Sequence, residues 1–149
     1  MATINTVKAS PVKMKKYRFI GHTADVGLIA HGARLSEAFA NAACGMFAII
    51  TNLRHVRAKE SRAVEVAAED SESLLFEWLN HLLYFFDAEM LLLKRFEITA
   101  MESGRLKATC YGEKYDPSRH KLKTGVKAAT YHMLTVDKAK HQVQVIFDI

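Results

Sequence analysis

The sequence predicts an α+β domain built in two layers, with two main helices on one side of a mostly antiparallel or mixed sheet. Two segments carry apolar residues at three- and four-residue steps, which is the spacing of a helix with one buried face. The remaining segments alternate apolar and polar residues at a period near two, which is typical of half-buried strands. The predicted order of elements is β-β-α-β-α-β-β-β-β, and this order favours the α+β class.

The first third of the chain contains two short strands and a helix. Tyr17–Ile20 and Val26–Ala30 are predicted as strands that flank a polar turn at Gly21–Asp25. The start of the helix is weakly marked, because Arg34 rather than a capping residue precedes the periodic segment. Its apolar face is expected to consist of Leu35, Phe39, Ala42, Ala43, Met46, Phe47 and Ile50.

A half-buried strand and a second helix follow. Val64, Val66 and Ala68 alternate with charged or small residues, as in a strand. Asp70 or Ser71 is expected to cap the free N–H groups at the start of the helix. Its apolar stripe consists of Leu74, Leu75, Trp78, Leu79, Leu82, Leu83 and Phe86.

The rest of the chain is predicted to be four strands. A tight turn at Ser103-Gly104 joins the first two, and Asp137–Lys140 joins the last two. The link Gly112–Gly125 is polar and contains Pro117, so we expect it to be mobile and on the surface. The strands are Leu91–Met101, Arg105–Tyr111, Val126–Val136 and Gln142–Phe147.

Length and charge limit the possible functions. With 149 residues, half of them apolar, the chain is long enough for one compact domain with its own core. The net charge of +5 comes from the first 18 residues, which contain five basic residues and no acidic one, and the remainder holds sixteen of each. We therefore expect a basic, flexible leader at residues 1–16 and a single domain over residues 17–149, whose neutrality argues against nucleic-acid binding.

The sequence indicates a cytoplasmic protein. No apolar run is long enough to cross a membrane, and residues 1–16 lack the apolar core of a signal peptide. Cys44 and Cys110 lie in apolar segments, so they are expected to be buried, reduced thiols.

Two features are candidates for a functional site. The first is the polar turn Gly21–Asp25 between two apolar strands. The second is the C-terminus, where strand alternation continues to the last residue and so predicts that the terminal carboxylate of Ile149 is held beside Asp148. If Asp25 lies beside them, three anionic oxygen groups converge, and a hard divalent cation is their natural partner. A capped structural turn and a solvated chain end are the alternatives.

Other motifs give weaker signals. The histidines form none of the common zinc-binding spacings, and no nucleotide-binding loop or nucleophile elbow occurs in the sequence. Lys127 and Tyr131 are expected to share one face of a predicted strand, with His132 on the other face. Ordinary strand patterning explains these three residues equally well.

Several short sequence motifs follow one another between about Tyr17 and Ile149. They include Gly21-His22-Thr23-Ala24-Asp25-Val26, Glu37-Ala38-Phe39, Trp78-Leu79-Asn80, Tyr111-Gly112-Glu113, Thr130-Tyr131-His132 and Phe147-Asp148-Ile149. Together they resemble the archease family over nearly the whole chain, with only residues 1–16 outside the match.

The resemblance implies a non-catalytic, metal-binding accessory protein that activates an RtcB-type tRNA-splicing RNA ligase. Such a ligase uses GTP and manganese to join RNA ends, and the accessory protein promotes its guanylylation and multiple turnover. The accessory protein would contact RNA only indirectly, through the ligase. The alternatives are a metal-dependent phosphoesterase that acts on RNA ends and an RNA-binding chaperone.

The resemblance also implies a set of site residues. The metal ligands would be Asp25, Asp148 and Ile149, and the ion would be calcium, or else magnesium or manganese. His22, Lys127 and His132 match family positions as residues that contact the partner or shape the site.

Overall fold

A computed structural model describes residues 16–21 and 25–149. The predicted leader, residues 1–16, therefore lies almost entirely outside the described residues, and so does His22. The elements run in the order β1 (Tyr17–Gly21), β2 (Asp25–His31), α1 (Leu35–Ile50), the 3-10 turn η2 (Leu53–His55), β3 (Glu60–Ala67), α2 (Ser71–Glu89), β4 (Leu91–Glu102), β5 (Arg105–Lys114), β6 (Ala128–Ala129), β7 (Thr135–Asp137) and β8 (Gln142–Asp148).

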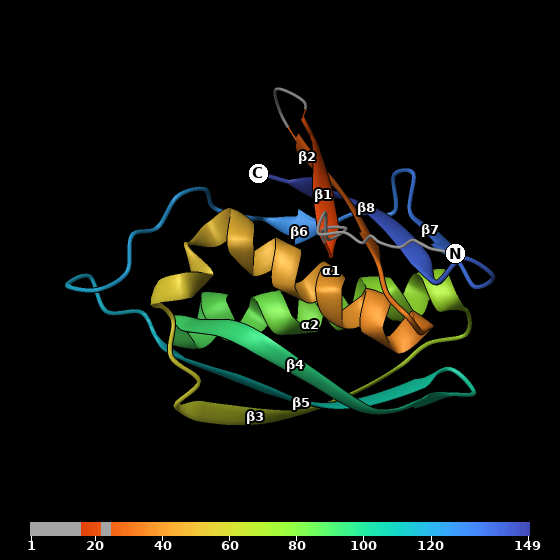
Figure 1. Cartoon of the computed structure of the whole chain (residues 1–149), viewed down its shortest axis with the longest axis horizontal. Helices are drawn as coiled ribbons and strands as arrows, with labels where there is room; N and C mark the ends of the chain where they lie inside the picture. The colour runs from red at the N-terminus through yellow and green to blue at the C-terminus, as the bar shows by residue number, and fades with distance from the viewer. Residues whose placement is uncertain (1–15, 22–24) are drawn as a thin grey trace, which may run out of the picture.

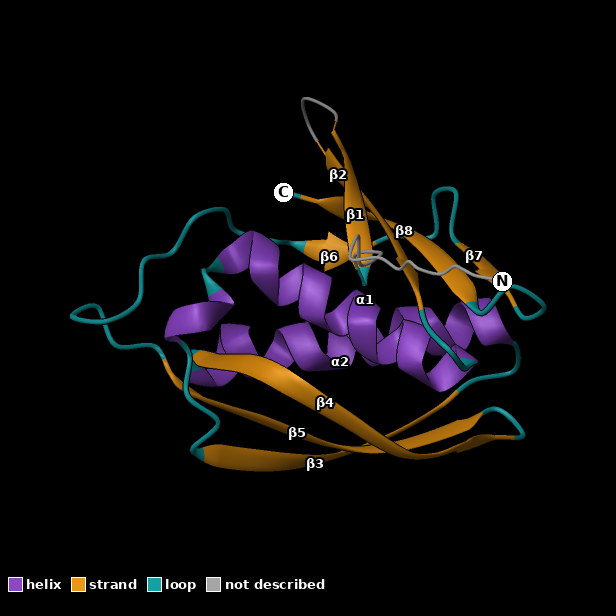
Figure 2. Cartoon of the chain, viewed as in Figure 1, coloured by secondary structure: helices purple, strands orange, loops and turns teal. Residues whose placement is uncertain are grey.

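Two antiparallel sheets enclose the two helices (Figure 1, Figure 2). The first sheet has the order β1-β2-β8-β6, and β7 also pairs with β8. The second sheet has the order β3-β5-β4. All described strand pairs are antiparallel. The α+β class, the two helices and the antiparallel pairing are confirmed.

The prediction of two layers was wrong in one respect, because the strands form two sheets rather than one. The reason lies in α1, which is apolar over more than one face. Ten of the sixteen residues of α1 are buried. On one side Leu28 of β2 packs against Gly45. A Cβ atom added at Gly45 would lie only 2.8 Å from the Leu28 side chain. On another side Phe47 stacks on Phe96 of β4, with ring centroids 6.0 Å apart.

Most local predictions are confirmed with small shifts of their boundaries. Asp70 caps α2 by accepting a hydrogen bond of 2.7 Å from the Ser73 N–H, whereas Arg34 gives α1 no side-chain cap. Cys110 is fully buried, Cys44 is half-buried, and both thiols are free. No helix in the described part of the chain is long and apolar enough to span a membrane.

The predicted strand Val126–Val136 was wrong, because it is two short strands separated by a turn. Ala129 pairs with Phe147 and Thr135 pairs with Gln144, so six steps along this segment match only three along β8. The three extra residues loop out, and Met133 takes a left-handed conformation with φ 54°.

The prediction that Gly112–Gly125 is a surface link was also wrong in part, at its first three residues and at His120. β5 continues to Lys114, because Gly112 lets the backbone of β4 approach to a distance that no side chain would permit. Glu113 and His120 are buried. The remainder is tied to the end of α1, where the Thr51 hydroxyl donates to the Lys121 carbonyl at 2.8 Å.

Candidate metal-binding site

Asp25 and Asp148 lie directly opposite each other on neighbouring strands. The antiparallel register of β2 and β8 pairs Asp25 with Asp148 and Val26 with Phe147. Directly opposed residues project from the same face of a sheet, with Cβ atoms about 4.5–5.5 Å apart. Phe147 is fully buried, and a shift of one residue would expose it, so burial of Phe147 fixes the register that brings the two carboxylates together.

The last strand is held from its other side by β6. Ala128 pairs with Asp148, and the Lys127 N–H donates a hydrogen bond of 2.8 Å to the Asp148 carbonyl. Asn80 of α2 fastens β6 in turn, because its side chain accepts from the Ala129 N–H at 2.9 Å and donates to the Ala129 carbonyl at 3.3 Å. Asp148 therefore lies between two paired strands, and strand pairing continues to the residue before Ile149.

One oxygen of Asp25 lacks a partner. Among the described residues, its Oδ1 atom is the buried side-chain oxygen or nitrogen for which no hydrogen bond is found. A buried polar atom without a partner is unfavourable by roughly 1–3 kcal/mol, and more when it is charged. The Asp148 side chain, by contrast, is exposed. A cation that bridged the two carboxylates would satisfy the buried oxygen and remove their repulsion, so these residues fit a hard divalent ion.

The pair is not a complete ligand set of side chains. Within residues 16–21 and 25–149, no three histidine, cysteine, aspartate or glutamate side chains converge on one point. Further protein ligands from this part of the chain would be main-chain or terminal oxygens, such as those of Ile149.

The structure also places two other predicted site residues, Lys127 and His132. Lys127 is exposed and immediately precedes β6, where its backbone contacts Asp148. His132 is exposed in the turn between β6 and β7. The expectation that Lys127 and Tyr131 share a strand face was wrong, because Tyr131 belongs to that turn and stacks on Phe76 of α2 with centroids 4.1 Å apart.

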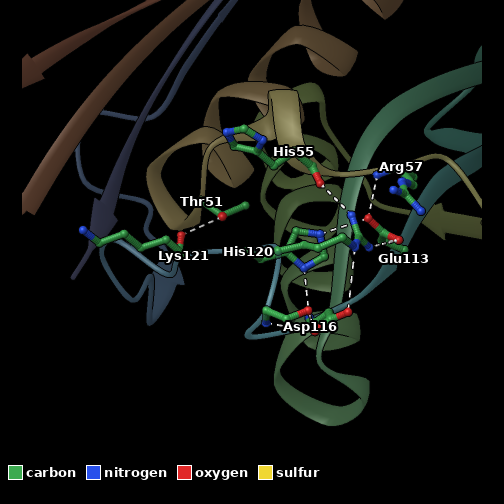
Figure 3. A network of polar contacts seen from close by, with 9 residues as sticks. Thr51, His55, Arg57, Glu113, Asp116, His120 and Lys121 are labelled. Carbon is green, nitrogen blue, oxygen red and sulfur yellow. Dashed lines mark hydrogen bonds and ion pairs between the residues drawn. The ribbon is translucent and has the colours of Figure 1, made fainter.

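A second polar cluster, which the sequence did not reveal, lies at the end of β5 (Figure 3). Glu113 accepts hydrogen bonds from Arg119 Nη2 at 2.6 Å and from the Arg57 N–H at 2.8 Å. His120 Nδ1 accepts from the Asp116 N–H at 2.9 Å, so its proton is on Nε2, which donates to Glu113 at 2.9 Å. Glu113 is in β5, Arg57 precedes β3, and Asp116, Arg119 and His120 lie in a loop without periodicity, so no sequence pattern pointed to them.

The contacts of Glu113 determine its ionisation. Burial alone would raise the pKa of this carboxyl, but the hydrogen bonds from Arg119, the Arg57 N–H and His120 outweigh burial and hold its pKa at about 2. Glu113 is therefore a carboxylate at neutral pH, and its charge is neutralised by Arg119.

Comparison with known proteins identifies close relatives over nearly the whole chain. The family model described as "Archease protein family (MTH1598/TM1083)" matches residues 17–149. The protein archease of Pyrococcus abyssi is 43% identical over 142 residues, which cover 91% of this chain and all of the relative. That of Sulfurisphaera tokodaii is 40% identical over 125 residues, which cover 83% of this chain and 90% of the relative.

Solved structures share the fold. The solution structure of protein 1598 from Methanobacterium thermoautotrophicum has a TM-score of 0.76 and 37% sequence identity, and the match covers 91% of this chain and all of that one. A Thermotoga maritima archease, described as a possible chaperone, has a TM-score of 0.56 over 97% of this chain and all of that one. Its sequence identity of 17% supports a common fold only.

Proposed function

This chain belongs to the archease family, and on that premise we propose that it is an accessory protein that activates an RtcB-type tRNA-splicing RNA ligase. Its proposed means is a divalent cation held by the opposed carboxylates of Asp25 and Asp148. The single observation that supports this proposal best is the buried, unpartnered Oδ1 of Asp25, opposite a second carboxylate.

The strands and their hydrogen bonds hold the two carboxylates in position, which supports the proposal. Asp25 comes from the first residue of β2, and Asp148 from the last residue of β8. Asn80 and the Lys127 N–H hold the strand on the far side of Asp148. In Figure 1 the β1–β2 hairpin and the C-terminus project away from the helices, so the pair lies at an end of the domain that a partner can approach.

The proposed mechanism separates binding from chemistry. A divalent cation at this site would supply positive charge, and such charge would offset the negative charge that develops on the phosphates of GTP during nucleotidyl transfer. Asp25 and Asp148 would hold and orient that charge, and Ile149 would contribute a main-chain or terminal oxygen. Lys127, whose N–H is bonded to the Asp148 carbonyl, and His22 and His132 are proposed to contact the ligase. The ligase provides the nucleophile and binds the RNA, so the accessory protein needs no catalytic residue of its own.

The test combines an activity assay with a metal-binding measurement. Multiple-turnover joining of a cyclic-phosphate RNA to a 5′-hydroxyl RNA is measured with the cognate ligase, GTP and manganese. Additions are the wild-type protein, Asp25→Ala, Asp148→Ala, or Asp87→Ala as an exposed acidic control on α2. We expect stimulation by the wild type and the control only. In calorimetry with calcium, magnesium and manganese, the wild type and Asp87→Ala should bind the cation, and the two site variants should bind it more weakly.

Two outcomes would contradict the proposal. Full stimulation by both folded site variants would remove the metal pair from the mechanism. Hydrolysis of RNA ends by the purified protein alone would indicate a phosphoesterase instead.

The role of Ile149 has its own test. A hexahistidine extension at the C-terminus converts the terminal carboxylate into a peptide bond, whereas the same extension at the N-terminus does not. We expect weaker metal binding for the first protein only. Equal affinities would show that the terminal carboxylate is not a ligand.

A further inference from the structure

Two adjoining hollows near the end of α1 are lined by basic residues. One, of about 380 Å³, is lined by Arg54, His55, Arg57 and Arg119. The other, of about 440 Å³, shares His55 and Arg119 with the first and extends to Lys121 and Lys123. We call these six residues the basic patch. Neither hollow has an aspartate or glutamate in its lining.

Most of the positive charge in the basic patch is uncompensated. Arg54, Arg57, Lys121 and Lys123 are exposed, and none of them forms an ion pair with another described residue. The buried carboxylate of Glu113 is satisfied by Arg119, the Arg57 N–H and His120, so it does not reach the other cations. The patch therefore presents four free cations on one surface.

The backbone beneath the patch is fixed. The two segments that supply its residues are joined by hydrogen bonds from the Thr51 hydroxyl to the Lys121 carbonyl at 2.8 Å and from the Lys123 N–H to the Ile50 carbonyl at 2.7 Å. Arg119 adds a bond of 3.2 Å from Nη1 to the His55 carbonyl. Figure 3 shows the contact between Thr51 and Lys121 near the end of α1, with the Lys121 side chain extending away from the network. Cations on a fixed backbone lose less entropy when they bind a ligand.

We propose that the basic patch binds the phosphate backbone of an RNA strand. Guanidinium groups match the oxygens of a phosphate with paired hydrogen bonds, and lysine adds point charges. No aromatic residue other than His55 and His120 lines the hollows, and His120 is buried in its own hydrogen bonds. The patch thus lacks a broad stacking platform for bases, and binding through phosphates should be insensitive to sequence.

The position of the patch favours RNA over other polyanions. Lys127, whose N–H is bonded to Asp148, follows Lys123 by four residue steps, and four extended steps span at most about 14 Å. The Lys123 end of the patch therefore lies within about 14 Å of Lys127, the neighbour of the candidate metal site. The choice of RNA, rather than an acidic protein segment, rests on the proposed function, because an RNA ligase brings RNA ends to that site.

The test measures RNA binding by the full chain without any ligase. Fluorescence anisotropy of a labelled single-stranded RNA is recorded across a range of salt concentrations. The variants are R54A/R57A and K121A/K123A, each of which removes two exposed cations without breaking a described ion pair. The matched control is K107A/K140A, which removes two exposed cations from other surfaces. The N-terminal basic residues are the same in all four proteins.

Two phosphate contacts to a single strand account for a slope of about 1.4 in a plot of log affinity against log salt. Each patch variant should therefore lose about 1.4 from the slope. Between about 1 M salt, where the affinities should converge, and about 0.1 M salt, this makes its binding about 25-fold weaker than that of the wild type, with the control unchanged. Patch variants that bind like the control would overturn the proposal. Displacement of the RNA by polyglutamate of equal charge would overturn it too, and would point to an acidic protein segment.

The same variants separate this inference from the proposed function. Guanylylation of the ligase needs GTP but no RNA, so R54A/R57A should stimulate that step like the wild type. Failure of RNA binding would leave stimulation of guanylylation intact, and failure of stimulation by the wild type would leave RNA binding intact.

Discussion

Replacing Asp148 with asparagine should alter stability in opposite directions with and without a divalent cation. Asp25 and Asp148 are paired in register, so their carboxylates face each other from the same side of the sheet. Two unit charges about 5 Å apart repel by about 0.8 kcal/mol in water and about 3 kcal/mol at an effective dielectric constant of 20. Because the Asp148 side chain is exposed, we take the lower end, about 1 kcal/mol. In a chelator, Asp148→Asn should be more stable than the wild type by that amount.

A saturating cation should reverse this order. A ligand that binds only the folded state at 100 times its dissociation constant stabilises that state by about 2.7 kcal/mol. The wild type should receive this full gain, whereas Asp148→Asn has one charged ligand fewer and should receive little. The wild type should then be the more stable protein by about 1–2 kcal/mol, a shift of roughly 2–8 °C in Tm at this chain length.

Urea denaturation and thermal melting measure directly which protein is more stable, without and with the cation. Each protein is unfolded in EDTA and then in calcium, magnesium or manganese, with Asp87→Asn as an exposed control on α2. A variant that is less stable than the wild type in EDTA would show that Asp148 makes a favourable contact rather than a repulsive one. A wild type that is indifferent to all three cations would refute the metal site itself.

Three further substitutions test how the rest of the fold supports the site. Glu113→Gln should lower the free energy of unfolding at pH 7 by about 3 kcal/mol, since the folded pKa of about 2 lies below the ordinary 4.5. That contribution is present above about pH 5 and is lost as pH falls toward 2, so unfolding measured against pH should give a flatter curve for the variant in this window. Asn80→Ala leaves the N–H and carbonyl of Ala129 without their side-chain partner, which should cost about 1–3 kcal/mol in urea denaturation and weaken metal binding in calorimetry through the displaced β6. Gly112→Ala would place a Cβ 1.8 Å from the Leu92 carbonyl oxygen, so its midpoint of urea denaturation should fall by the equivalent of about 1–3 kcal/mol, while Gly125→Ala, which meets no atom within 4 Å, should be nearly neutral.

The helices and most strands could be predicted from the sequence, because their signals are local. Apolar spacing marked α1 and α2, and Ser103-Gly104 marked the β4–β5 hairpin, where both residues have positive φ. The number of sheets could not be predicted, because it depends on how many faces of each helix are covered. The separation of β6 from β7 could not be predicted either. The apolar and polar alternation around Tyr131 is the same for a continuous strand and for a strand that loops out three residues.

The candidate site was predictable to the extent that it follows from strand pairing. Alternation up to Ile149 suggested a paired last strand, and the pairing of β2 with β8 brings Asp25 opposite Asp148. The absence of a hydrogen-bond partner at Asp25 Oδ1 is a property of packing, which no local sequence pattern reveals. The contacts among Glu113, Arg119 and His120 depend on how a loop folds back on α1, and no periodic pattern encodes that path.

The balance of charge was the least informative property of the sequence. Sixteen basic and sixteen acidic residues cancel over residues 19–149, and that sum argued against binding to nucleic acid. Recognition depends on the local potential rather than on the sum. The fold gathers Arg54, Arg57, Lys121 and Lys123 around hollows without an acidic lining, while Asp25 and Asp148 face each other elsewhere on the domain. A formally neutral domain can therefore carry one surface suited to phosphates and another suited to a cation.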